Sequence, residues 1–327
     1  RTETDMTQGN IVRLIAYFAF PLLLANIFQQ LYNTVDTWVV GNFVGKNSFS
    51  AVGTLASVIN TIIGFFIGFS NGAGVVISHF FGAKDEEKTS AATHTFFAST
   101  LILCVLFTFL GLALIPLLIK LVNSPAEVAV EQVIYLRIYF AGASGLLIYN
   151  MGSSILRAVG NSRYSLYFII ISASMNIVLD LLFVIVFHMG TAGVAYATII
   201  AQGVSALSVL VVLFRTDSCV KISLNKVKID WNILKKIFAV GLPSALQMSV
   251  TAFSNVFVQS YINFFGSDVM GGYTAFNKLD QLILLPMMAI SMATQTFVGQ
   301  NLGMSLTERA RKGVKTSVLM ALFSTTV

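Results

Sequence analysis

Charged residues are scarce in this sequence. Asp, Glu, Lys and Arg make up 10% of its 327 residues and hydrophobic residues 56%, whereas about a quarter of the residues in soluble proteins are charged. The uncharged stretches are residues 14–35, 47–83, 89–119, 138–156, 181–214, 237–267 and 281–307. Because a membrane helix needs about 20 apolar residues, this pattern excludes a soluble globular domain and predicts a polytopic membrane protein.

Cysteine and histidine are also rare, with two and three copies. Cys104 falls in an apolar stretch and Cys219 in a polar one, so no disulfide is expected. His79, His94 and His188 are dispersed and lack the two-histidine helix spacing of a zinc site. The sequence contains no metal or nucleophile constellation, so we expect neither an enzyme nor a cofactor. The formal net charge of +6 indicates topology rather than nucleic-acid binding.

Clusters of Gly, Asn and Ser divide the apolar stretches into membrane spans. The polar segment Arg1–Asn10 precedes an apolar run that is long enough to cross a bilayer, so no cleavable signal peptide is expected. The predicted spans lie near residues 14–40, 49–81, 90–119, 132–156, 164–187, 191–214, 233–263 and 269–302, and another starts at about 313. The expected fold class is therefore all-α.

The distribution of Lys and Arg predicts the orientation of these spans. Sixteen of these residues lie on the side of the amino terminus, whereas only Lys46 and Lys120 lie on the other side. Arg137 and Lys278 fall near or within spans. Since Lys and Arg are enriched in cytoplasmic loops, we expect a multi-pass protein of the cell membrane with a cytoplasmic amino terminus.

The chain contains a weak internal repeat. Pro21 and Asn33 match Pro243 and Asn255 at an offset of 222 residues. A unit of six spans returns the chain to its starting side, so two such units would form parallel lobes with the substrate site between them.

The longest polar stretch separates these two units. We expect a first lobe at residues 1–214, a cytoplasmic loop at 215–231 and an incomplete second lobe at 232–327. By the repeat, roughly 115 residues of the second lobe are missing, so the sequence is expected to be a fragment.

Two carboxylates lie inside predicted spans. Asp36 is late in the first span and Asp180 is in the fifth. A carboxylate at the centre of a membrane helix costs about 2.5–3.5 kcal/mol, which makes a functional role the first hypothesis. Thr198, in the sixth span, lies at a depth similar to that of Asp180, and Asn176 shares a helix face with Asp180.

This group of oxygen-bearing side chains suits the capture of H⁺ or Na⁺. Two close carboxylates in a low-dielectric pocket can share a proton near neutral pH, and hard oxygen ligands bind Na⁺. The alternative is that each aspartate caps a neighbouring helix or faces a water-filled crevice. Pro21, on the same helix as Asp36, is either a static kink or a hinge that links protonation of Asp36 to helix shape.

Several segments resemble the multidrug and toxic compound extrusion (MATE) family in their order and spacing, across essentially the whole chain. They are Pro21–Gly45 with Gln-Leu-Tyr-Asn-Thr-Val-Asp at its centre, Gly82–Lys84, Leu156–Asn161, Asn176–Asp180, Gly241–Pro243 and Val298–Gly303. The resemblance implies a bundle of twelve helices in two six-helix lobes, of which about eight to nine are present. It is closer to the DinF-like branch, whose ion site lies in the first lobe.

The resemblance also implies roles for individual residues. The implied cation site consists of Asp36, Asn176, Asp180 and Thr198, with Na⁺ possible at the two aspartates, and the implied substrate cavity is lined by Gln29, Tyr32 and Asn150. Another branch carries a glutamate early in the seventh span, where this chain has Ala245–Ser249 and no acid.

These observations together predict a secondary antiporter that works by alternating access. It would export small organic compounds, cationic and amphipathic ones, in exchange for H⁺ or Na⁺. The expected partners are this substrate and the lipid bilayer, with no nucleic acid, and the expected state is a monomer. The alternative within the same superfamily is a flippase for lipid-linked precursors or polysaccharide, for which Arg137 and Lys278 are the only candidate cavity cations. A channel would need a symmetric polar ring, which the divergent repeat lacks.

Overall fold

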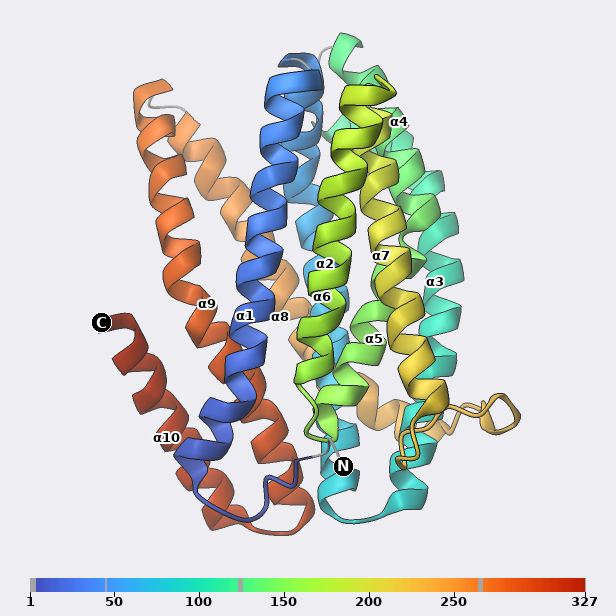
Figure 1. Ribbon diagram of the computed structural model, residues 1–327, viewed down its shortest axis with the longest axis vertical. Coiled ribbons are helices and arrows are strands. Elements are labelled where there is room, and N and C mark those ends of the chain that lie inside the picture. The colour runs from blue at the N-terminus through green and yellow to red at the C-terminus, as the bar shows by residue number, and fades with distance from the viewer. Residues whose placement is uncertain (1–3, 45, 123–125, 264–266, 327) are drawn as a thin grey trace.

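The computed structural model describes residues 4–44, 46–122, 126–263 and 267–326, which form a bundle of long helices that run side by side (Figure 1). No β-strand occurs among these residues. The α-helices are α1 (Ile11–Val39), α2 (Lys46–Gly82), α3 (Glu86–Val122), α4 (Ala126–Gly142), α5 (Ser144–Ala158), α6 (Arg163–Asp180), α7 (Gly190–Arg215), α8 (Trp231–Asn263), α9 (Ser267–Gly303) and α10 (Thr307–Thr326). The π-helical turns are η1 (Val40–Val44) and η2 (Leu181–Val186), and a short 3₁₀ turn is η3 (Leu224–Lys226).

The lengths of the helices confirm the predicted all-α polytopic membrane fold. Within the described part of the chain, seven helices are each long and apolar enough to cross a membrane, and α4 with α5 can form an eighth crossing. Large apolar side chains such as Phe109 and Leu110 of α3 point outward, where a bilayer would cover them. The chain is therefore a multi-pass membrane protein.

The fourth crossing differs from the single run predicted over residues 132–156. It is broken into α4 and α5, which are bent by 44° relative to each other. Gly142 and Gly145 flank the break, and Gly–Ser sequences are a common cause of helix kinks.

One end of the bundle carries most of the positive charge. The connections from α2 to α3, α5 to α6, α7 to α8 and α9 to α10 lie at this end together with residues 4–10 (lower end in Figure 1). We call it the basic end, because these connections and the adjacent helix termini hold Lys84, Arg163, Arg215 and Arg311. Asp36 and Asp180 lie near the far ends of α1 and α6, toward the opposite end.

The helices that follow residue 230 pack against the first two helices of the chain. α2 contacts both α8 and α9, and α1 contacts α9 and α10. The backbones of α2 and α8 approach closely at Gly72, where an added Cβ would lie 2.3 Å from Cα of Gly241. Small residues allow such close packing, which stabilises helix pairs in a membrane by van der Waals contact.

The polar segment between α7 and α8 is attached to α3. The backbone N–H of Ser223 donates to Nε2 of His94 at 3.0 Å, and the N–H of Asp230 donates to Oγ1 of Thr95 at 3.1 Å. The predicted loop at residues 215–231 therefore has a fixed position at the basic end, although it lacks long regular structure.

Candidate functional site

The two aspartates predicted within the membrane face each other between α1 and α6. Their carboxyl groups lie close enough to interact electrostatically. Asp180 is fully buried and Asp36 is partly buried. Because α1 and α6 pack along each other, the pair is held by two membrane-spanning helices rather than by loops.

This pair lacks the hydrogen-bond donors that a buried carboxylate normally has. Asp36 Oδ1, both carboxylate oxygens of Asp180 and both amide atoms of Asn176 are buried without a hydrogen-bond partner among the described residues. A buried polar group without a partner costs about 1–3 kcal/mol. A proton shared by the carboxylates, or a hard cation bound to these oxygens, would remove that cost.

The donor set fits H⁺ or Na⁺ better than a transition metal. Throughout the described ranges, no group of three or more His, Cys, Asp or Glu side chains gathers at one point. Carboxylate and amide oxygens are hard ligands, and thiol and imidazole ligands are not part of the pair.

Both helices change their winding next to the acids. The π-turn η1 begins at Val40, one turn after Asp36, and η2 begins at Leu181, directly after Asp180. At the first junction the N–H of Val40 is shared between the carbonyls of Asp36 and Thr37. Such π-turns are frequent at functional sites, and here they place an adjustable stretch of backbone beside each carboxylate.

Tyrosine side chains surround the pair on one side. Tyr32 lies one turn before Asp36 on α1, beside Gln29, and is close enough to interact electrostatically with both aspartates. Tyr135 of α4 also interacts with both acids. Its ring stacks on that of Tyr139 with 6.1 Å between the ring centroids.

Further polar groups extend this shell to α5 and α7. Tyr149 of α5 faces Tyr32, and Gln202 of α7 lies beside the hydroxyl of Tyr139. The sequence interpretation missed Tyr135, Tyr139, Tyr149 and Gln202. The spacing of Tyr135 and Tyr139 at i and i+4 was the available signal, since buried tyrosine hydroxyls seek polar partners.

The remaining predicted residues have local partners. Thr198 Oγ1 donates to the carbonyl of Val194 at 3.0 Å, and Asn150 Nδ2 donates to the carbonyl of Leu146 at 2.9 Å, each within its own helix. These bonds do not link Thr198 or Asn150 to the acid pair. Pro21 is buried inside α1, which continues as one helix on both sides of it.

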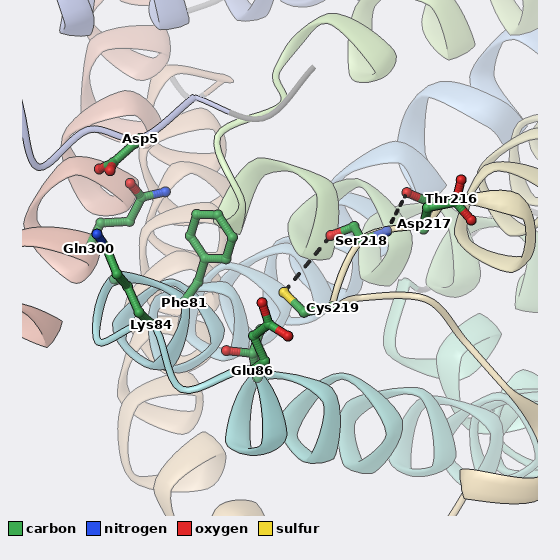
Figure 2. A pocket seen from close by; sticks show the side chains of 11 residues that line it. Asp5, Phe81, Lys84, Glu86, Thr216, Asp217, Ser218, Cys219 and Gln300 are labelled. Atoms are coloured by element: carbon green, nitrogen blue, oxygen red, sulfur yellow. Dashed lines mark hydrogen bonds between the residues drawn. The ribbon is translucent and has the colours of Figure 1, made fainter. Parts of the chain in front are cut away.

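A separate cavity of about 820 Å³ opens at the basic end (Figure 2). Its lining includes Asp5, Lys84, Glu86, Asp217 and Gln300, which come from the amino-terminal segment, the α2–α3 and α7–α8 regions and α9. Because the aspartate pair lies toward the opposite end, this cavity is distinct from the candidate cation site.

Comparison with known proteins assigns the chain to a family. The MatE family model matches residues 21–182 and 240–327, which is well over half of the chain. The protein named "Probable multidrug resistance protein YpnP" of Bacillus subtilis is 32% identical over 305 residues, covering 93% of this chain and 68% of that protein. "Multidrug export protein MepA" of Staphylococcus aureus is 21% identical over 96% of this chain and 69% of its own length.

Solved structures agree in their fold. A MATE transporter in complex with MaL6 superposes with a TM-score of 0.92 and 27% identity over 98% of this chain and 71% of its own. A multidrug resistance MATE family transporter in an outward-facing conformation superposes with a TM-score of 0.90, also at 27% identity, over 98% of this chain and 71% of its own. The branch within the family is not resolved by these matches. With its family model, relatives and helical architecture in agreement, the chain belongs to the multidrug and toxic compound extrusion (MATE) family of membrane transporters.

Proposed function

We propose that the protein is a secondary antiporter that exports small organic compounds, cationic and amphipathic ones, in exchange for H⁺ or Na⁺. The observation that carries this proposal is the pair Asp36 and Asp180, which face each other within the bilayer-spanning helices and lack hydrogen-bond partners among the described residues. A site that is costly when empty and stabilised by a cation is what an ion-driven exchanger needs. The names of the relatives YpnP and MepA support an organic, drug-like cargo.

The coupling would arise from competition between the two bound states. A cation at Asp36 and Asp180 lowers the negative charge of the pair and weakens the negative field that a cationic substrate would otherwise experience near Tyr32 and Gln29. Binding one therefore weakens binding of the other, so that the two species cross in opposite directions. Pro21, on the same helix as Asp36, is the proposed point at which α1 changes its shape between these states.

The charge distribution supports a proposal for the orientation of the protein in the cell. We infer that it is a monomer in the cell membrane with the basic end in the cytoplasm. The cation would then enter from the outside, where Asp36 and Asp180 are nearer to the surface, and no resident cofactor would take part.

Transport by inverted membrane vesicles tests this proposal. The full-length protein should accumulate a fluorescent organic cation when a gradient of H⁺ or of Na⁺ is imposed, each tested separately. Asp36→Asn and Asp180→Asn should each abolish gradient-driven uptake, because an amide has no negative charge to attract Na⁺ and cannot take up and release a proton. The matched control is Asp217→Asn, which changes a fully exposed carboxylate in the α7–α8 segment and should leave transport unchanged.

The outcomes separate the parts of the proposal. Undiminished uptake in both Asp36→Asn and Asp180→Asn would overturn the site assignment. Uptake at the same rate with and without each gradient would overturn antiport as the mechanism.

A further inference from the structure

The amino-terminal residues 4–10 have a defined position at the basic end. Met6 is fully buried and belongs to one apolar cluster with Phe18 of α1 and Phe297 of α9. Oδ1 of Asp5 accepts hydrogen bonds from the backbone N–H of Thr7 at 2.8 Å and from its hydroxyl at 2.5 Å, which fold the segment into a turn. The segment is therefore part of the contact between α1 and α9.

One side chain joins this segment to two helices. Gln300, near the end of α9, is fully buried, and its Oε1 accepts a hydrogen bond from the N–H of Met6 at 2.9 Å. Its Nε2 donates to the carbonyl of Ala158, the last residue of α5, at 3.0 Å. Figure 2 shows the Gln300 side chain beside Asp5, at the edge of the cavity. Because the amide is buried, losing either partner would leave an unpaired polar atom.

Two neighbouring side chains hold the segment from the side of α9 and α10. Nδ2 of Asn301 donates to the carbonyl of Met6 at 3.1 Å. The guanidinium of Arg309, on α10, donates to the carbonyl of Gly9 at 2.9 Å and lies over the ring of Phe297 at 5.4 Å. The segment is thus bonded to the helices that follow residue 230.

The turn between α5 and α6 contacts the same segment from the other side. Gly160, in this turn, has a φ of +85°, and an added Cβ would lie 2.1 Å from the carbonyl oxygen of Thr4. A left-handed backbone and a contact this close both require glycine. The segment therefore bridges the α5–α6 turn and the end of α9.

We propose that Gln300 is a gate residue, which holds the basic end closed between α5 and α9 with residues 4–10 as its clamp. This inference rests on the alternating access of the proposed function. Opening the basic end between α5 and α9 would separate Nε2 of Gln300 from Ala158 and withdraw Met6 from its apolar cluster in the same movement. The closed arrangement would then be lost as a unit, which gives a two-state element rather than a gradual one.

Distances between spin labels in the reconstituted full-length protein test the gate. The labels replace two exposed residues, through Glu87→Cys at the start of α3 and Lys312→Cys on α10, in a background without other cysteines. Gln300→Ala removes both hydrogen bonds and should shift the ratio of short to long distances about ten-fold toward the long ones. Gln295→Ala, at an exposed position of the same helix, should leave the ratio unchanged.

A second pair of variants keeps the test decisive if Gln300→Ala does not fold. Arg309→Gln removes the bond to Gly9 and should shift the ratio in the same direction. Arg311→Gln, two residues further along α10, removes an equal charge that is exposed and pairs with Glu308, and it should have no effect.

The outcomes distinguish the gate from the antiport proposal. If the wild type shows both label distances and Gln300→Ala and Arg309→Gln leave their ratio unchanged, the gate is overturned and the antiporter proposal is unaffected. A single distance in the wild type and in every variant, with or without H⁺ and Na⁺ gradients, would refute both.

Discussion

Replacing Asp180 by asparagine should make the protein more stable while it abolishes ion coupling. Asp180 is fully buried, and neither of its carboxylate oxygens has a hydrogen-bond partner among the described residues. The amide of an asparagine would present Nδ2 to the facing carboxylate of Asp36 and would donate a hydrogen bond without any bound cation. A buried site whose oxygens lack partners without a cation becomes more stable when a substitution supplies the missing hydrogen bond.

The size of the effect follows from the groups involved. A buried unsatisfied polar group costs about 1–3 kcal/mol, and a hydrogen bond to a charged group contributes about 1.5–3 kcal/mol. We therefore expect a gain of about 2 kcal/mol for Asp180→Asn. At about 2–4 °C per kcal/mol, the unfolding midpoint should rise by about 5 °C.

Thermal unfolding in detergent at pH 8 measures this effect. The full-length wild type, Asp180→Asn and the exposed control Asp217→Asn are compared in the absence of Na⁺ and again with Na⁺ present. The control should unfold at the wild-type temperature. A fall in the midpoint of Asp180→Asn would refute the reasoning, since it would mean that the carboxylate is already satisfied in the native protein.

Two further predictions concern the helix contacts. Gly72→Leu should lower the unfolding midpoint by several degrees or prevent folding, because its Cβ would meet the backbone at Gly241 and overpacking costs about 1–3 kcal/mol. At Gly203 an added Cβ would have no atom of another described helix within 4 Å, so Gly203→Leu should unfold like the wild type. Hydrogen bonds from the Lys88 ammonium and backbone N–H lower the pKa of Asp85, so its stabilisation of the first turn of α3 is present above about pH 4 and is lost as the pH falls through that lowered value. The protection of the amides in this turn against hydrogen exchange, relative to an unfolded chain at the same pH, should fall over that interval in the wild type. Asp85→Asn, which keeps a capping oxygen, should show no such fall in protection.

The sequence alone was enough for the membrane class and for the presence of two acids within apolar spans. Hydropathy is a local property, since each helix must by itself present about 20 apolar residues to the bilayer. An acid within such a run stands out without any knowledge of its neighbours. Asp36 and Asp180 could therefore be selected directly, and comparison of their depths predicted that they lie in the same half of the membrane.

The tertiary structure decided which groups meet. Tyr135 reads as an ordinary aromatic residue of a membrane helix, because its i, i+4 spacing with Tyr139 indicates a shared helix face but not that α4 turns Tyr135 toward the acids of α1 and α6. The break at Ala143 is similar, since glycine and serine permit a bend but do not require one.

Gln300 gives the clearest contrast between the two sources of information. In the sequence it is one of several polar residues in the eighth predicted span, with no sign of its partners. In the folded protein its amide bonds to Met6 and Ala158, which lie 294 and 142 residues away along the chain. Hydrophobic periodicity depends on neighbours within a few turns of one helix, whereas a hydrogen bond between distant segments depends on how the helices pack, and only the three-dimensional arrangement specifies that.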